Sequence, residues 1–137
     1  MASNAPQPRV LVADDDPDIR RILAVNLEAM GYQVTEVSDG EEALRLARQM
    51  VPAFVVLDVM MPELDGYGVL HSLRGHPVTA RIPVVMLSAL TTDRDIWDGW
   101  QAGADYYLTK PFMLDELLHF VELLELGRPP EGAVLAP

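Results

Sequence analysis

The chain has no cysteine, no long apolar run and few basic residues, and each absence narrows what it can be. None of its apolar stretches approaches the roughly 20 residues needed to cross a bilayer, so a membrane protein is not expected. With 10 basic against 21 acidic residues the formal charge is −11, which repels phosphate backbones and argues against direct nucleic-acid binding. Residues 1–9 lack the apolar core of a signal peptide, which together with the absent cysteine favours a cytoplasmic location.

The composition that remains is that of one globular domain. Of the 137 residues, 50% are hydrophobic and 23% are charged, as is usual for globular proteins. A domain of this length buries roughly two thirds of its extended-chain surface on folding. We expect residues 9–126 to form the domain, residues 1–8 to be a disordered N-terminus, and residues 127–137 to be a flexible tail or linker stub.

Five short apolar runs alternate with five helical patterns, which predicts a parallel sheet covered by helices on both faces. Strands are expected at 10–13, 33–37, 53–58, 83–88 and 106–110, and helices at 17–30, 39–50, 66–74, 92–102 and 113–125. The stripe of the first helix that faces the core is expected to contain Ile19, Ile22, Leu23, Leu27 and Met30. The corresponding stripe of the last helix is expected to contain Leu114, Leu117, Leu118, Val121 and Leu124.

Carboxylates follow two of these predicted strands. Asp14 and Asp15 come after the first strand, and Asp58 closes the third. The carboxyl ends of neighbouring parallel strands meet at one edge of a sheet, so the three acids are expected to converge. Two unit charges about 4 Å apart interact by roughly 4 kcal/mol at an effective dielectric of about 20, so the cluster needs protonation or a cation. Oxygen ligands without His or Cys favour Mg²⁺, or Mn²⁺.

A hydroxyl and an ammonium group are expected at the same edge, because Ser88 and Lys110 close the fourth and fifth strands. Asp58 is predicted to attack a phosphoryl group, while the metal and Lys110 neutralise charge and Ser88 donates a hydrogen bond to the product. A single Asp after a strand is more often a turn residue or a helix cap. Four strand ends that each supply a suitable group favour a phosphoryl-transfer site instead.

Several short segments together resemble the receiver domain of two-component response regulators, of the chemotaxis-regulator type. These segments are Asp14-Asp15, Asp58, Met60-Met61-Pro62, Asp65-Gly66, Ser88-Ala89 and Lys110-Pro111-Phe112. The resemblance covers about residues 9–126. It implies a flavodoxin-like, doubly wound (βα)5 three-layer sandwich of the α/β class, whose parallel strands have the order 2-1-3-4-5.

The resemblance also implies the partner and the metal ligands. Asp58 would be the phosphoacceptor, modified by a sensor histidine kinase or a phosphotransfer protein. Asp15, Asp58 and the main-chain carbonyl of Met60 would bind Mg²⁺ directly, and Asp14 would bind it through water. The chain would then be a signalling switch and not an enzyme.

Further residues receive roles from the same resemblance. Ser88, Ala89 and Lys110 would contact the phosphoryl group, and the Lys110–Pro111 peptide bond is expected to be cis. Ser88 and Tyr107 would form the switch: Ser88 moves toward the phosphoryl oxygens and Tyr107 fills the space it leaves. Such a change is a shift between two existing packings.

An output face is expected on the helix at 92–102, the strand at 106–110 and the last helix. Its apolar residues would be Ile96, Trp100, Tyr107 and Phe120. They would dock a downstream protein, a fused effector domain or a second copy of the chain, unless they only complete the core. The last helix contains no Lys or Arg, which argues against the acid–base ladder through which the family's winged-helix transcription factors dimerise.

Met60 and Leu90, two residues after Asp58 and Ser88, cannot orient a hydrolytic water, so self-catalysed dephosphorylation is expected to be slow. One alternative is an aspartyl-nucleophile phosphatase or phosphotransferase, as in haloacid dehalogenase-like enzymes, which carry a second Asp at the position of Met60. The other alternative is a degenerate receiver that serves only as a scaffold.

Overall fold

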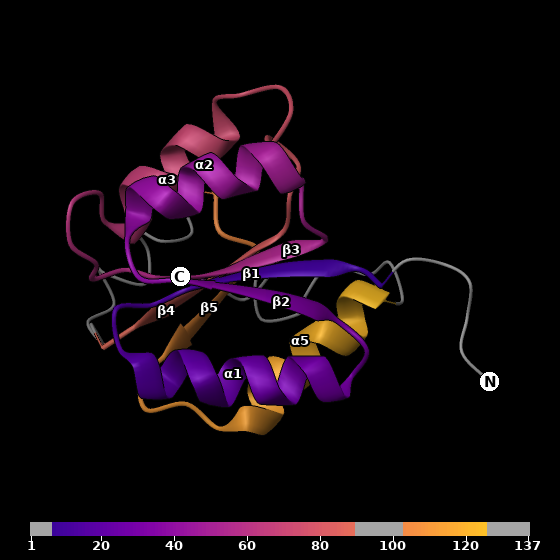
Figure 1. Cartoon of the computed structure of the whole chain (residues 1–137). Helices are drawn as coiled ribbons and strands as arrows, with labels where there is room; N and C mark the ends of the chain where they lie inside the picture. The colour runs from indigo at the N-terminus through magenta and orange to yellow at the C-terminus, as the bar shows by residue number, and fades with distance from the viewer. Residues whose placement is uncertain (1–6, 90–102, 126–137) are drawn as a thin grey trace.

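The computed structural model describes residues 7–89 and 103–125, which form a central parallel sheet with helices on both faces (Figure 1). The elements are β1 (Arg9–Ala13), α1 (Pro17–Ala29), β2 (Gln33–Val37), α2 (Gly40–Met50), β3 (Phe54–Asp58), α3 (Gly66–Arg74), β4 (Val84–Ser88), β5 (Tyr106–Thr109) and α5 (Leu114–Glu125). Each lies within one residue of its predicted bounds. The helix expected at 92–102 falls outside the described residues.

The five strands have the order β2-β1-β3-β4-β5, and every neighbouring pair is parallel. This is the flavodoxin-like order that the resemblance implied. In Figure 1, α2 and α3 lie on one face of the sheet, and α1 and α5 lie on the other. Because helices cover both faces, every residue of β3 and β4 is buried, as is usual for the central strands of parallel sheets.

Aspartates begin three of the helices by accepting hydrogen bonds from main-chain N–H groups in the first turn. Asp16 accepts from Asp18 N at 2.9 Å, and Pro17 occupies the first position of α1, as the sequence predicted. Asp39 caps α2 and Asp65 caps α3 in the same way. These caps fix where each helix leaves the carboxyl edge of the sheet.

At the opposite edge of the sheet, one arginine connects a helix to the residues that precede two strands. The guanidinium of Arg74, at the end of α3, donates to the carbonyl oxygens of Ile82 at 2.7 Å and Gly103 at 2.9 Å. It also pairs with Asp105 at 2.8 Å, and the same Asp105 oxygen accepts from Val84 N. The Arg74 side chain therefore links the end of α3 to the residues that precede β4 and β5.

The inward stripe predicted for α1 is wrong at Ile22, which is 56% exposed. The fully buried positions of α1 are Leu23, Ala24 and Leu27, so the small Ala24 occupies a core position. An apolar stripe covers only part of a helix, and Ile22 lies at its edge. The sequence pattern could not distinguish that edge from the centre.

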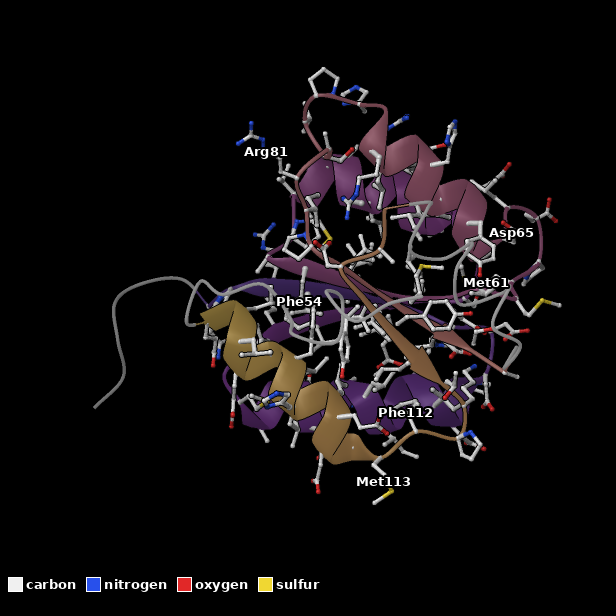
Figure 2. The ribbon with its side chains drawn as sticks, turned by 180° about the vertical axis from the view of Figure 1, so that it is seen from behind. Phe54, Met61, Asp65, Arg81, Phe112 and Met113 are labelled. Atoms are coloured by element: carbon white, nitrogen blue, oxygen red, sulfur yellow. The ribbon has the colours of Figure 1, made fainter. Side chains whose placement is uncertain are left out.

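The stripe predicted for α5 is also wrong in part, because Phe120 is fully buried and Leu118 is only half-buried. The ring of Phe120 stacks on Tyr106 with centroids 5.1 Å apart and meets Phe54 edge-on at 6.3 Å. Phe120 therefore belongs to the core beneath the sheet, and its assignment to an exposed output face is incorrect. Figure 2 shows Phe54 on the side of the sheet that α5 covers.

No helix in the described ranges is long and apolar enough to span a bilayer.

Candidate functional site

Three carboxylates meet at the carboxyl edge of the sheet, as the sequence predicted. One oxygen each of Asp14, Asp15 and Asp58 lies within 4.8 Å of the others. Asp14 follows β1 and Asp58 ends β3, and these strands are direct neighbours. Asp14 and Asp58 are buried, whereas Asp15 is exposed. The cluster is therefore set into the protein but open to solvent on one side.

The main chain around Asp14 is held on several sides. Its N–H donates to the carbonyl of Val37 at the end of β2, and its Oδ1 accepts from Asp16 N at 2.9 Å. Its carbonyl accepts from the guanidinium of Arg20 at 2.7 Å. No role for Arg20 was predicted from the sequence. The only signal was its position in the first turn of the helix, from which a long side chain can reach back to the residues between β1 and α1.

Lys110 lies over the two buried acids. Its Nζ is 2.9 Å from Asp14 Oδ2 and 3.3 Å from Asp58 Oδ2. The main-chain N–H of Lys110 donates to the carbonyl of Ser88 at 2.6 Å, and the Lys110–Pro111 peptide bond is cis, in agreement with the expectation. One ammonium group thus pairs with two of the three clustered carboxylates, so it cannot balance the charge of all three.

The electrostatics of the cluster follow from burial and crowding. Burial, and then the charge of Asp14, raise the pKa of Asp58 from its ordinary 3.8 to about 7, although Lys110 opposes them. Burial lowers the pKa of Lys110, but its contact with Asp14 and the charges of both acids outweigh burial and raise that pKa. The buried pair of acids therefore needs more positive charge than Lys110 supplies.

The donor atoms of the cluster fit a hard divalent cation. Asp14 Oδ2 is buried and lies 2.9 Å from the Lys110 ammonium, and apart from this ion pair no hydrogen bond to it is found among the described residues. The three clustered side chains offer only carboxylate oxygens. Oxygen donors of this kind suit Mg²⁺, which keeps part of its water shell.

The remaining predicted site residues lie around this edge. Ser88 is buried at the end of β4, one residue beyond Leu87, whose Cα pairs with that of Asp58. Ala89 follows it and is exposed. Tyr107, on β5, is half-buried, and its hydroxyl lies 3.5 Å from that of Tyr67 on α3. Ile96, Trp100 and Leu90 lie outside the described residues.

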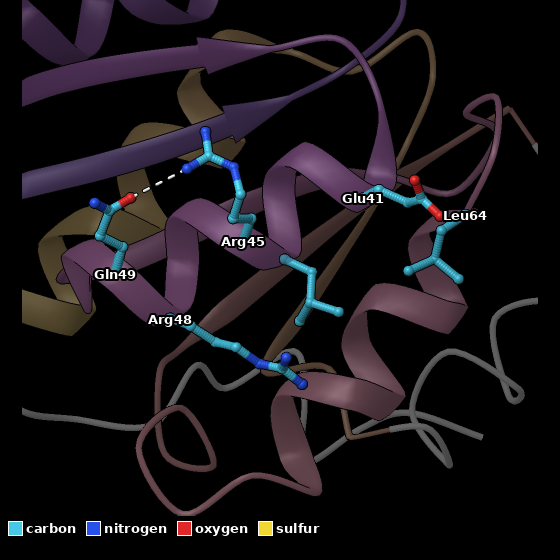
Figure 3. Close-up of a pocket in the computed structure, with 6 residues that line it drawn as sticks. Glu41, Arg45, Arg48, Gln49 and Leu64 are labelled. Carbon is cyan, nitrogen blue, oxygen red and sulfur yellow. Dashed lines mark hydrogen bonds between the residues drawn. The ribbon is translucent and has the colours of Figure 1, made fainter.

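An apolar groove of about 500 Å³ opens beside Lys110, between the start of α1 and the start of α5. It is lined by Ile19, Ile22, Ala89, Lys110, Pro111, Phe112 and Leu114. A larger hollow of about 640 Å³ lies over α2, where Arg45 donates to Gln49 (Figure 3). That hollow contains none of the clustered acids, so its size does not make it the site of chemistry.

Comparison with known proteins identifies the family. Residues 10–122 match the model of the response regulator receiver domain. The chain is 45% identical over 117 residues to the DNA-binding dual master transcriptional regulator RpaA of Synechocystis, and the match covers 85% of this chain and 48% of that protein. It is 49% identical to the transcriptional regulatory protein KdpE of Mycobacterium tuberculosis, with 80% and 47% covered. The chain thus spans about half the length of these relatives.

Solved structures agree with this assignment. The receiver domain of the Francisella response regulator 1452 is 42% identical, with a TM-score of 0.80, and the match covers 85% of this chain and 95% of that one. The receiver domain of a sensor histidine kinase from Pseudomonas aeruginosa PAO1 is 32% identical, with a TM-score of 0.76 and coverage of 85% and 96%. It is described with a magnesium ion coordinated in its active site cleft. On its sequence, its strand order and its acidic cluster, this chain belongs to the family of response regulator receiver domains.

Proposed function

We propose that this receiver domain is the phosphoacceptor switch of a two-component system, and that Asp58 is the acceptor. The observation that carries the proposal is the arrangement at the carboxyl edge of the sheet. A buried carboxylate lies 3.3 Å from an ammonium group and next to two further acids. A signalling role is supported by the family, whose members act as switches and not as multiple-turnover enzymes.

Mg²⁺ is the proposed cofactor. Asp15, Asp58 and the main-chain carbonyl of Met60 would bind it directly, and Asp14 would bind it through water. The buried oxygen of Asp14, which is paired only with the Lys110 ammonium among the described residues, and the all-oxygen donor set support this assignment. When bound, Mg²⁺ would neutralise charge on the phosphoryl oxygens.

In the proposed reaction, a carboxylate oxygen of Asp58 attacks the phosphorus atom of a phosphohistidine. The bond from phosphorus to the donor's imidazole nitrogen breaks, and that nitrogen leaves with the bonding electron pair. Lys110 would hold a phosphoryl oxygen by charge, and the Ser88 hydroxyl and Ala89 would contact the others. Asp58 must be ionised to attack, so a cation that lowers its pKa of about 7 would favour the reaction.

The groove beside Lys110 supports a protein as the phosphoryl donor. The donor histidine has to come within bonding distance of Asp58, so the surface around it must rest on the rim of this site. Exposed Ile22 and the other apolar residues of the groove offer such a surface next to Lys110. We propose that a histidine kinase or a phosphotransfer protein docks there, in the cytoplasm.

The output would follow from movement of Ser88 and Tyr107. Tyr107 is half-buried and packs with the residues between the sheet and α3, on the strand that pairs with the strand of Ser88. The curated relatives are about twice as long and are named as transcriptional regulators, which supports an effector domain or a downstream protein as the recipient of the signal. We propose that residues 9–126 form the receiver unit, and that self-dephosphorylation is slow because Met60 offers no group to orient water.

The proposal is tested by incubating the protein with acetyl phosphate and Mg²⁺ and measuring its intact mass. We expect the mass of one phosphoryl group to be added to the wild type and to an Asp18→Ala control, which changes an exposed acid outside the cluster. Asp58→Ala should abolish the addition. A phosphoryl group that never appears, or that persists in Asp58→Ala, would contradict the assignment. Repeated turnover of a small phosphate ester would indicate a phosphatase instead.

A further inference from the structure

The segment that leads from Asp58 to α3 is pressed against the start of α2. A side-chain Cβ atom at Gly40 would lie 1.7 Å from the carbonyl oxygen of Leu64 and 2.7 Å from its carbonyl carbon. Real Cβ atoms essentially never come this close to another heavy atom. The main chain of Leu64 therefore packs directly on Gly40, in the space that a side chain at position 40 would fill. We call this contact the seat of Leu64 on Gly40.

The side chain of Leu64 is held from another direction. A Cβ atom at Gly68 would lie 2.4 Å from Leu64 Cδ1, which is the far end of a flexible side chain. Leu64 also packs against the core between the sheet and α2, and Figure 3 shows it beside the hollow over that helix. Leu64 is thus enclosed by the first turns of two different helices.

The same segment is tied down next to Asp58. Val59 donates its N–H to the carbonyl of Leu87 on β4 at 2.8 Å, and its own carbonyl accepts from Gly66 N at 2.9 Å. Met60 N donates to Asp58 Oδ1 at 3.3 Å. Residues 60–63 therefore span from a fixed point at Val59 to a fixed point at Leu64. The carbonyl of Met60 belongs to this span.

We infer that Gly40 is a positioning residue for the metal site, although it lies on α2 and every proposed ligand lies on a strand or in a loop. The contact of Gly40 with the main chain of Leu64 fixes the C-terminal end of residues 60–63, the segment that contains Met60. This contact would hold Met60, whose N–H donates to Asp58 Oδ1, in place next to that carboxylate. The inference rests on the proposed function, since it assumes that Met60 contributes a ligand for Mg²⁺.

The experiment compares Mg²⁺ binding by the wild type and by Gly40→Ala, measured by isothermal titration calorimetry. The added methyl group must displace the main chain of Leu64, so we expect the dissociation constant of Mg²⁺ to rise by about tenfold or more, as when groups that support metal ligands are lost. Backbone amide NMR signals of residues 59–66 should shift without Mg²⁺, while those of α1 remain in place. A loss of stability alone would not change the affinity of the folded fraction.

Two further glycines provide matched controls. In Gly75→Ala the new Cβ atom would meet nothing closer than 3.5 Å, so Mg²⁺ affinity should equal that of the wild type. In Gly68→Ala the neighbour that must move is a side-chain tip, so the affinity should change far less than in Gly40→Ala. An equal loss of affinity in all three variants would contradict a specific role for Gly40.

A second variant decides the matter if Gly40→Ala does not fold. Leu64→Ala adds no atoms and removes the side chain that keeps this segment between α2 and α3, so it should also weaken Mg²⁺ binding. If the wild type binds no Mg²⁺, the proposed function fails. If the wild type binds Mg²⁺ and the folded Gly40→Ala and Leu64→Ala variants bind it equally well, the inference about Gly40 fails and the proposed function stands.

Discussion

Asp58 combines two properties at the scale of the residue: it is almost completely buried, and it lies next to another acid. Both properties favour its protonated form when no cation is bound. A residue that would have to be ionised for the proposed phosphoryl transfer is thus held in a place that opposes ionisation. Ionising Asp58 in this position costs free energy, but the same position brings its carboxylate close to Lys110 and to the other acids.

Without Mg²⁺, the unfolding free energy of the protein should depend on pH through Asp58. Because the pKa of Asp58 rises from 3.8 to about 7 on folding, the folded protein holds this proton more tightly than the unfolded chain. The stabilisation that results is fully present below the pKa of Asp58 in the unfolded chain, 3.8, and is lost as the pH rises through about 7, its pKa in the folded protein. Asp58→Asn, which carries no charge, should therefore exceed the wild type in unfolding free energy at pH 8 by on the order of 2 kcal/mol.

Urea denaturation at several pH values measures this difference. We expect it to shrink toward pH 4, where Asp58 is protonated, and also at pH 8 when Mg²⁺ stabilises the ionised wild type. The exposed substitution Asp18→Asn should show neither trend. A difference between Asp58→Asn and the wild type that stays constant from pH 4 to pH 8 would show that the charge of Asp58 is not its cause.

A second residue-scale prediction concerns Val51, which follows α2 in the left-handed backbone region with a φ of 46°. This conformation is unfavourable for a β-branched residue, and its side chain is 48% exposed, so burial offsets little of the cost. Val51→Asn should raise the unfolding free energy by about 1 kcal/mol, measured by thermal and urea denaturation. Val78→Asn, at an equally exposed valine without a positive φ, should give no such gain. Equal effects at both positions would argue against backbone strain.

At the scale of the element, helix α1 has two sets of apolar residues with different surroundings. Leu23, Ala24 and Leu27 face the core, whereas Ile19 and Ile22 line the groove beside Lys110. Met113 directly precedes α5, is 66% exposed and points away from the sheet (Figure 2). The apolar residues at the starts of α1 and α5 that line the groove would provide the proposed docking surface for another protein.

The prediction at this scale separates docking from chemistry. Ile22→Asp should slow phosphotransfer from a histidine kinase that modifies the wild type by about tenfold or more, because a charge would enter an apolar interface. Phosphorylation by acetyl phosphate, which needs no protein contact, should keep its rate. Val25→Asp is the control, since Val25 is similarly exposed on α1 but does not line the groove. The docking proposal is wrong if both variants accept the phosphoryl group from the kinase at the wild-type rate.

The elements also show where sequence patterns suffice. The alternation of short apolar runs with helical patterns located every described strand and helix within one residue. The patterns failed at the edges of helix stripes, where Ile22 was expected inside and Phe120 outside. The period of a helix gives the direction of its apolar face, but neighbouring aromatic rings such as Tyr106 decide how wide that face becomes.

At the scale of the whole molecule, the convergence of the acids was predictable because parallel strands bring their carboxyl ends to one edge. The strand order itself came from the resemblance to a known family and not from periodicity. The seat of Leu64 on Gly40 could not be predicted, since it depends on how closely α2 approaches the segment before α3. The role of Arg20 was missed for a similar reason, because its contact is with a main-chain carbonyl.

The two edges of the sheet contain different kinds of groups. All the proposed reactive groups lie at the carboxyl edge, whereas at the amino edge Arg74 links the end of α3 to the residues that precede β4 and β5. Exposed Arg81, close to that amino edge, and Asp65, beside the reactive edge, lie at opposite ends of the molecule in Figure 2. A dye or a solid support attached near Arg81 would thus leave the reactive groups accessible, which makes this position suitable for an immobilised sensor of phosphate transfer.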